Sequence, residues 1–208
     1  MAGLGLGPPD FALFEIEDPD DRSAALEAVL LPKLGAIAQQ CLSGLGRVAG
    51  HDLFLHPGKL QRKRGAAPEE LLVAFCESER GFRGLPFLGI ALTREHLHAR
   101  VGVRGEGPRR EPMRQALQRE AVNLSRKGKP FRRLRQFSGW NHEELPELAP
   151  AHSAAFWEEL AEELAAGEAG LDVGICWTQD EARSVALGDL LGVFRDLAPL
   201  YKVLVNAE

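Results

Sequence analysis

The sequence predicts a single α+β domain, with a mostly antiparallel or mixed sheet covered by helices. Short apolar runs of strand length follow one another through tight turns in the middle of the chain, and stretches with helical apolar spacing lie before and after them. No repeat or low-complexity linker divides the 208 residues, which is a length that can bury one sizeable core. Successive strands with short connections favour antiparallel pairing. We therefore expect one domain over residues 10–208.

The first sixty residues predict two short strands and a long, interrupted helix. The apolar run Phe11–Ile16 has strand length, and a second strand is expected at Asp52–His56. Between them, Asp18-Pro19-Asp20-Asp21 supplies an acidic start for a helix with apolar side chains at helical spacing. Pro32 should kink or divide this helix, because proline lacks the amide hydrogen and crowds the preceding turn.

Three strands are expected in the middle of the chain. Leu71–Cys76 and Phe87–Thr93 are apolar runs separated by a turn-rich segment. In His96–Arg104, apolar residues alternate with histidines and arginines, and this period of two predicts one buried face and one wet face.

The C-terminal part predicts three helices and a strand. Helices are expected at Glu111–Ser125, after Pro150 and at Val185–Leu197, and a buried strand at Leu171–Trp177. The helix after Pro150 carries apolar residues on one side and glutamates on the other. The pattern at 131–137 is ambiguous.

The composition predicts a cytoplasmic protein. No apolar run is long enough to span a membrane. Residues 1–9 lack a basic start and a cleavage pattern, so we expect a disordered tail there rather than a signal peptide. Cys41, Cys76 and Cys176 are odd in number and widely spaced, which indicates reduced, buried thiols.

The charge of −5 is unevenly distributed along the chain. Residues 59–136 carry 19 Lys/Arg against 8 Asp/Glu, and residues 137–208 carry 3 against 14. This asymmetry can mark an anion-binding half. Alternatively, the basic and acidic halves face each other in the fold, and both interpretations stay open here.

Several familiar motifs are excluded. The glycines at 3, 5 and 7 precede the first apolar run instead of following a strand, and Gly58-Lys59 lacks the rest of a phosphate-binding loop. His96 and His98 can share a strand face, but two imidazoles alone make an incomplete metal site. No metal or cofactor is therefore expected.

Two basic turns are the most unusual feature. After the histidine at position 56 comes a Pro-Gly pair and then a run of cations, and a second basic turn joins the next two strands. Guanidinium groups match phosphate or carboxylate oxygens, and a histidine beside them can exchange a proton near neutral pH. The alternative is a pair of solvated loops. The residues that would form a site are His56, Lys59, Arg62, Lys63, Arg80 and Arg83.

These turns, together with scattered positions along most of the chain, resemble the YktB-like family of small bacterial proteins with one α+β domain. The resemblance implies a fold and a candidate site, to which it adds Tyr201 as a ligand-binding residue, but no activity. The matching positions are Pro32-Lys33-Leu34; His56, Lys59, Arg62 and Lys63 in a His-x-x-Lys-x-x-Arg-Arg loop; Pro68 with Val73-Ala74-Phe75; Arg80-Gly81-Phe82-Arg83; Pro86; His96; Glu106 and Pro108; Asn141-His142; and Leu200-Tyr201-Lys202.

The chain departs from the family at three positions. Leu60 and Phe87 stand where the family has histidines, and Asn141 replaces an aspartate beside His142. These changes remove groups that a mechanism based on a full histidine set would need.

Three hypotheses follow. In the first, the two turns bind a phosphate-bearing ligand, either a small molecule such as a nucleotide or a nucleic acid, although the net charge and the few aromatic residues argue against nucleic acid. In the second, His56 and His142 act as acid and base in a metal-independent hydrolase or phosphoesterase. In the third, the protein is a non-catalytic interaction module whose acidic C-terminal half contacts a basic partner.

Overall fold

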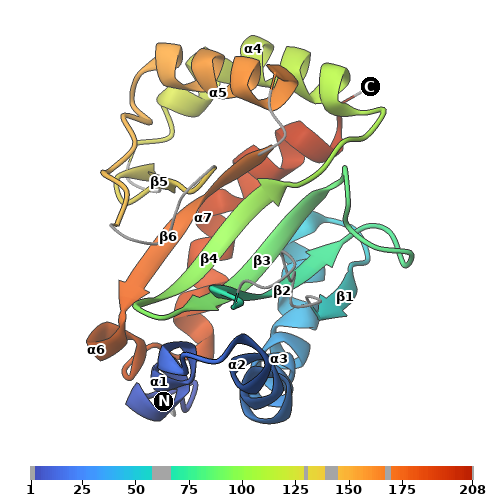
Figure 1. Ribbon diagram of the computed structural model, residues 1–208. Helices are drawn as coiled ribbons and strands as arrows, with labels where there is room; N and C mark the ends of the chain where they lie inside the picture. The colour runs from blue at the N-terminus through green and yellow to red at the C-terminus, as the bar shows by residue number, and fades with distance from the viewer. Residues whose placement is uncertain (1–2, 58–66, 129–130, 139–144, 167–169, 208) are drawn as a thin grey trace.

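The computed structural model describes residues 3–57, 67–128, 131–138, 145–166 and 170–207, and it confirms the α+β fold (Figure 1). The described strands form one sheet in the order β1-β2-β3-β4-β6-β5, and every neighbouring pair is antiparallel. The strands are β1 (Phe54–Pro57), β2 (Glu70–Cys76), β3 (Pro86–Thr93), β4 (His96–Val103), β5 (Arg135–Gln136) and β6 (Leu171–Thr178).

The helices cover one face of this sheet and one of its ends. Two long helices, α3 (Leu31–Ala49) and α7 (Leu187–Val205), pack behind the sheet, while α4 (Arg110–Ser125) and α5 (Ala154–Ala166) lie side by side at the top of the view (Figure 1). The main core fills the space between α3, α7 and the inward side chains of the strands. Within the described part of the chain, no helix combines the length and apolar composition needed to cross a membrane.

The N-terminal segment differs from the sequence prediction. Residues 11–16 are not a strand: α1 (Pro8–Ala12) leads into a 3₁₀ turn (Leu13–Glu15). Two prolines in the first turn favour a helix start, and the Asp10 carboxylate accepts a hydrogen bond from the Gly7 amide at 2.8 Å. The helical spacing places both Phe11 and Phe14 in the core.

The described residues ahead of α1, residues 3–7, pack against the rest of the protein. We expected a disordered tail over residues 1–9, but the Leu4 amide donates a hydrogen bond to the Val185 carbonyl at 2.9 Å, and Leu6 is 3% exposed. The Gly/Leu/Pro composition suggested a tail because a local pattern cannot register a long-range contact with residues 183–186.

Pro32 divides the first long helix as expected. Helix α2 (Pro19–Ala25) continues into a π-helical turn (Leu26–Leu30), and α3 begins at Leu31 with Pro32 in its first turn. Pro32 has no amide hydrogen and so cannot donate to the carbonyl four residues earlier. At the residue before it, the Leu31 amide donates to the Leu26 carbonyl, five residues back, which is the hydrogen bond of a π-helix.

The second face of the sheet, opposite α3 and α7, is buried as well. It carries a small apolar cluster and the polar residues of β4. The expectation of a wet face on β4 is therefore wrong: His98 is 0% and Arg100 is 1% exposed. Phe137 covers them, with its ring edge-on to His98 at 4.9 Å and beneath the Arg100 guanidinium at 4.7 Å. The apolar cluster comprises Leu72, Ala74, Cys76, Phe87 and Ala91.

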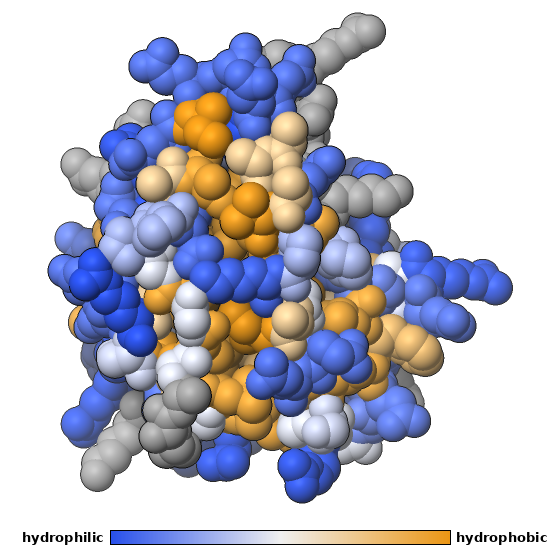
Figure 2. All heavy atoms as spheres, turned by 90° about the horizontal axis from the view of Figure 1, so that it is seen from below, coloured by the Kyte–Doolittle hydropathy of each residue, from blue (hydrophilic) through white to orange (hydrophobic). Residues whose placement is uncertain are grey.

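Figure 2 shows the molecule from below, at the end where the N-terminal helices and α6 (Gln179–Ala182) lie. Apolar residues reach the surface there between charged ones. In the π-helical turn, Val29 is 53% exposed. Single exposed apolar side chains are common on soluble domains, so this exposure alone indicates no function.

Gly174 of β6 should not tolerate a side chain. A Cβ there would lie 2.3 Å from the Ala99 carbonyl oxygen, a backbone atom that cannot move aside. We expect Gly174→Ala to lower the free energy of unfolding by about 1–3 kcal/mol in chemical denaturation. In the control Gly192→Ala, within α7, a Cβ lies within 4 Å of no described atom. That change should instead add about 0.5–1 kcal/mol. Equal effects of the two substitutions would contradict this packing.

Candidate anion-binding site

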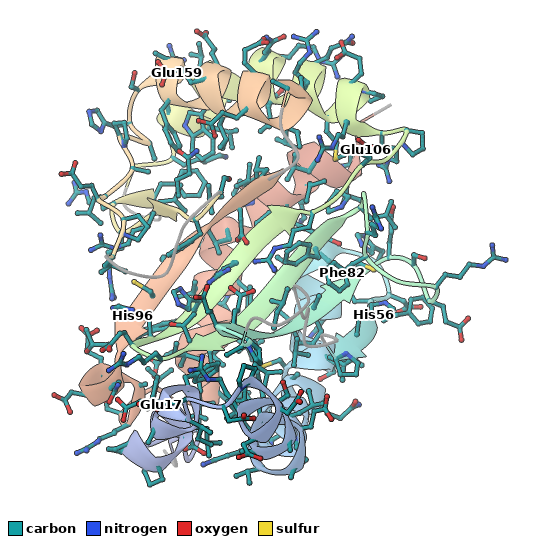
Figure 3. All side chains as sticks on the ribbon, viewed as in Figure 1. Glu17, His56, Phe82, His96, Glu106 and Glu159 are labelled. Atoms are coloured by element: carbon teal, nitrogen blue, oxygen red, sulfur yellow. The ribbon has the colours of Figure 1, made fainter. Side chains whose placement is uncertain are left out.

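His56 connects β1 to the turn between β2 and β3. It pairs with Ala74 in the sheet, and its Nε2 lies 2.8 Å from the Ser78 carbonyl oxygen. A carbonyl only accepts, so Nε2 carries the hydrogen and donates it, which makes Nδ1 the acceptor nitrogen of the neutral ring. The imidazole also lies beside Phe82 of the turn, with ring centroids 6.2 Å apart (Figure 3). The end of β1 and the second basic turn are therefore in contact.

Arg80 and Arg83 are both exposed on this turn, whose backbone is fixed to the end of β4. The Gly84 amide donates to the Arg104 carbonyl at 2.7 Å, and the backbone of Arg83 forms an isolated parallel β-bridge with the backbone of Arg104. Gly84 is required there, because its φ is +71° and a Cβ would lie 2.5 Å from the Glu106 carbonyl oxygen. These backbone contacts thus fix the position of the turn that carries Arg80 and Arg83.

The carboxylate at the start of the turn is paired elsewhere, so it does not neutralise Arg80 or Arg83. Glu77, at the start of the turn, pairs with Arg109 at 2.6 Å. Among the described residues, no carboxylate forms an ion pair with Arg80 or Arg83.

Of the remaining predicted site residues, four lie outside the described residues and one is buried in the core. Lys59, Arg62, Lys63 and His142 lie outside the described residues, so their convergence with the turn stays a prediction. Tyr201 is fully buried on α7, where its hydroxyl lies 3.3 Å from His51 Nε2. Burial, reinforced by the Glu77 carboxylate, raises the pKa of that hydroxyl above its ordinary value.

A second group of charges, which the sequence analysis did not identify, lies on the second face of the sheet. Arg100 Nη1 contacts the Glu70 carboxylate at 2.6 Å and Asp172 Oδ2 at 3.2 Å. Arg104 contacts the same two acids, at 2.9 Å and 2.5 Å. We call these four residues the ion network. A signal was present in the sequence, since each acid lies at or near the end of an apolar run, but its partner could not be read from spacing.

The network and the helices join the basic and acidic parts of the chain. Arg100 and Arg104 pair with Asp172, and Arg114 of α4 pairs with Glu162 of α5. These contacts fit the interpretation that the two halves face each other. Burial alone would lower the pKa of Arg104, but Asp172 and Glu70 outweigh it and raise that pKa, so the guanidinium stays charged.

The thiols and imidazoles offer little chemistry here. The cysteines are buried and unpaired, and burial raises the pKa of each, to about 12 for Cys41, so none is an activated nucleophile. The rings of His96 and His98 lie 5.8 Å apart. In the described parts of the chain, no group of three His, Cys, Asp or Glu residues is placed to hold a metal ion.

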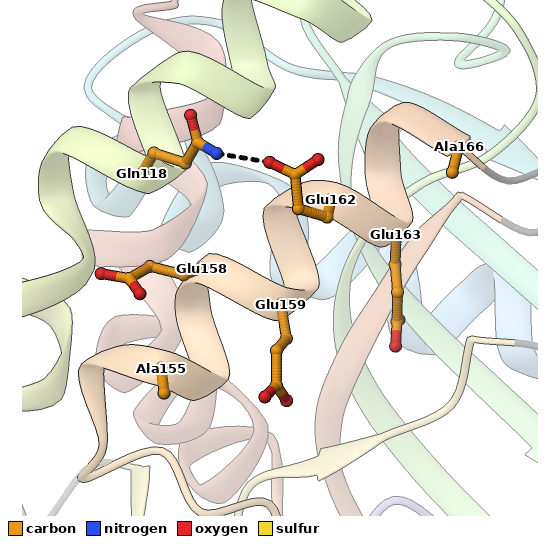
Figure 4. A pocket seen from close by; sticks show the side chains of 7 residues that line it. All are labelled: Gln118, Ala155, Glu158, Glu159, Glu162, Glu163 and Ala166. Carbon is orange, nitrogen blue, oxygen red and sulfur yellow. Dashed lines mark hydrogen bonds between the residues drawn. The ribbon is translucent and has the colours of Figure 1, made fainter.

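A hollow over α5 is lined by seven residues, of which four are glutamates (Figure 4). Two of its glutamates are already bonded: Glu162 accepts from Gln118 at 2.5 Å and pairs with Arg114, and Glu163 accepts from Gln136. The lining is Gln118, Ala155, Glu158, Glu159, Glu162, Glu163 and Ala166. This surface is the solvated face of an amphipathic helix.

Comparison with known proteins finds one matching family model and several bacterial relatives. Residues 8–201 match the model of the family DUF1054, a domain of unknown function. A UPF0637 protein of Bacillus licheniformis is 28% identical over 124 residues, covering 60% of this chain and 59% of the relative. One from Staphylococcus haemolyticus is 32% identical over 100 residues, covering 48% and 49%. One from Macrococcus caseolyticus is 29% identical over 115 residues, covering 55% and 57%. The matched part of the chain thus spans about half to three fifths of the length of these relatives.

His96, at the start of β4, makes the stability of the fold depend on pH. Burial lowers its pKa, and Arg135 adds to this effect against the opposing Glu95 and Glu181. Below about pH 6.5 the unfolded chain binds a proton that native His96 does not yet bind, so the free energy of unfolding falls as pH drops toward the lower native pKa. We expect His96→Gln to lose less stability than the wild type between about pH 7 and pH 5 in denaturant titrations. Parallel pH profiles would show that the native imidazole titrates normally.

Proposed function

The chain belongs to the DUF1054 family, and we propose that it is a binding protein for a phosphate-bearing ligand, held where β1 ends and the β2–β3 turn begins. The hydrogen bond from His56 to the Ser78 carbonyl carries this proposal, because it ties the start of the first basic segment to the second basic turn. Two segments predicted from sequence as separate basic elements are thereby adjacent at one point.

The charges of this region suit an anion. Arg80 and Arg83 are exposed on a fixed turn and form no ion pair with a described carboxylate, and the His56 imidazole lies against the same turn. Guanidinium groups recognise phosphate oxygens through charge-assisted, paired hydrogen bonds. Lys59, Arg62 and Lys63 follow His56 directly in sequence and would add further cations if they approach the same ligand.

A small phosphate ligand, such as a nucleotide, suits this surface better than a nucleic acid. Binding of single strands relies on aromatic side chains on which bases stack. Phe82, the aromatic residue of the turn, already packs against His56 and Phe87, with ring centroids 6.2 and 5.0 Å away. We place this activity in the bacterial cytoplasm, in keeping with three buried thiols.

A phosphoesterase remains the alternative proposal. It needs His56 and His142 to reach one substrate, and His56 contributes only Nδ1, because Nε2 is bonded to Ser78. A separation of the two imidazoles well beyond one bridging water, in an experimental structure, would exclude it. An interaction module that uses the acidic face of α5 is the third proposal, and binding of a basic peptide that fails after substitution of Glu158 and Glu159 would support it.

A titration with a fluorescent ATP analogue at low salt tests the nucleotide proposal. The double variant Arg80→Ala/Arg83→Ala should bind it about tenfold more weakly or worse than the wild type, because charge-assisted hydrogen bonds to phosphate are lost. Wild-type affinity should also fall steeply as salt rises.

The matched control is Arg119→Ala/Arg126→Ala, which removes the same charge from exposed positions on and just after α4. It should bind like the wild type. Equal weakening in both double variants would indicate nonspecific charge attraction, and no binding by the wild type would end the proposal.

A further inference from the structure

Arg100 occupies a place that the sheet leaves open for it. In the register of the sheet it stands between Gly89 of β3 and Gly174 of β6. A Cβ on Gly174 would lie 3.0 Å from Arg100 Cγ, so the glycine makes room for the long side chain to lie flat against the sheet. Its guanidinium lies over the Phe137 ring and is 1% exposed. The side chain is therefore fixed inside the protein.

One edge of this guanidinium has no hydrogen-bond partner among the described residues. Nη1 contacts Glu70 and Asp172, whereas Nε and Nη2 are buried and donate to no described group. These two nitrogens form the fork that grips two oxygens of a carboxylate or phosphate. Buried donors without a partner are uncommon in proteins, and charged ones are especially unfavourable. The fork thus indicates a ligand with two acceptor oxygens.

An unpaired acceptor lies beside the fork. Asp172 Oδ2 accepts from Arg100 at 3.2 Å and from Arg104 at 2.5 Å, but Oδ1 of the same carboxylate is buried and has no hydrogen-bond partner in the described part of the chain. The unpaired donors and the unpaired acceptor thus belong to two groups that touch. A complementary ligand has two acceptor oxygens and one hydrogen to donate.

We propose that Arg100 and Asp172 form a buried binding site for inorganic phosphate in a protonated form. Two phosphate oxygens accept from the fork, and a P–OH group donates to Asp172 Oδ1. Sulfate carries no proton near neutral pH and would face the carboxylate with like charge. A phosphate monoester, with a second pKa of about 6, is also mostly unprotonated at pH 7.

The surrounding charge favours an anion. The two arginines and the two acids of the ion network cancel, so the balance comes from neighbouring groups. Arg135 pairs with Gly174 in the sheet, one strand from Arg100, and Arg133 donates to the Cys176 carbonyl at 3.5 Å. Both add positive charge to the same face. This site is separate from the β2–β3 turn and does not depend on the proposed function.

The test uses the full chain and follows the side-chain Nε–H signals of arginine by NMR during titration at pH 7. Inorganic phosphate should shift the Arg100 signal until it saturates, and sulfate at equal ionic strength should not. Arg100→Lys keeps the charge but loses the fork, so phosphate binding should weaken about tenfold or more. Asp172→Asn removes the repulsion and supplies an amide donor, so this variant should also bind sulfate.

Arg80→Ala/Arg83→Ala is the control and should leave phosphate binding at Arg100 unchanged. If the wild-type Arg100 signal does not move, or moves equally with sulfate, the proposal is overturned. It is also overturned if folded Arg100→Lys binds phosphate like the wild type. If either variant fails to fold, the wild-type comparison of phosphate with sulfate decides the matter.

Discussion

The second face of the sheet depends on the pairing of two arginines with two carboxylates inside the protein. Arg100 is 1% exposed, and its carboxylate partners Glu70 and Asp172 have side chains that are 12% and 3% exposed. Burying such charges is costly unless each is matched, and removal of one partner leaves the other uncompensated. The strands accommodate the network with glycines: without Gly174 beside Arg100, the long side chain could not lie against the sheet. The ion network therefore determines which side chains this face can hold.

The same network links the interior to the candidate surface site. Arg104 contributes its guanidinium to the network, and its backbone carbonyl accepts from Gly84 of the β2–β3 turn. The backbone of Arg83 also forms a β-bridge with the backbone of Arg104. The turn that carries Arg80 and Arg83 is therefore attached to the end of β4, which the ion network holds in place. His56 then joins the turn from the other side through the Ser78 carbonyl. The positions of the exposed arginines thus follow from contacts made inside the protein.

Much of the fold could be predicted from the sequence, because the signals were local. The strands expected at 71–76 and 87–93 begin one residue earlier in the structure, and the antiparallel sheet follows from their short connections. The family resemblance is confirmed over residues 8–201. The helix at 8–12 was missed because an apolar run of six residues fits either a strand or a short helix, and the prolines decide between them only once Phe11 and Phe14 have a core to face.

The candidate sites were only partly predictable. Arg80 and Arg83 stand on a turn between two strands, as their place in the sequence indicated. The alternation in β4 was read correctly but interpreted as a wet face, because alternation reports two different faces and not which of them meets water. What buries Arg100 and His98 is Phe137, nearly forty residues away, and the Asp172 partner comes from β6, which pairs with β4 across a long connection. No local pattern contains such a contact.

A double-mutant cycle on Arg100 and Glu70 tests the role of the ion network most directly. The free energy of unfolding is measured for the wild type, Arg100→Met, Glu70→Gln and the double variant. If the network organises the second face, each single change leaves an unmatched buried charge, and the two losses together should exceed that of the double variant by at least about 1 kcal/mol. Losses that add within about 0.5 kcal/mol would contradict this account and show that the pair makes no energetic contribution of its own.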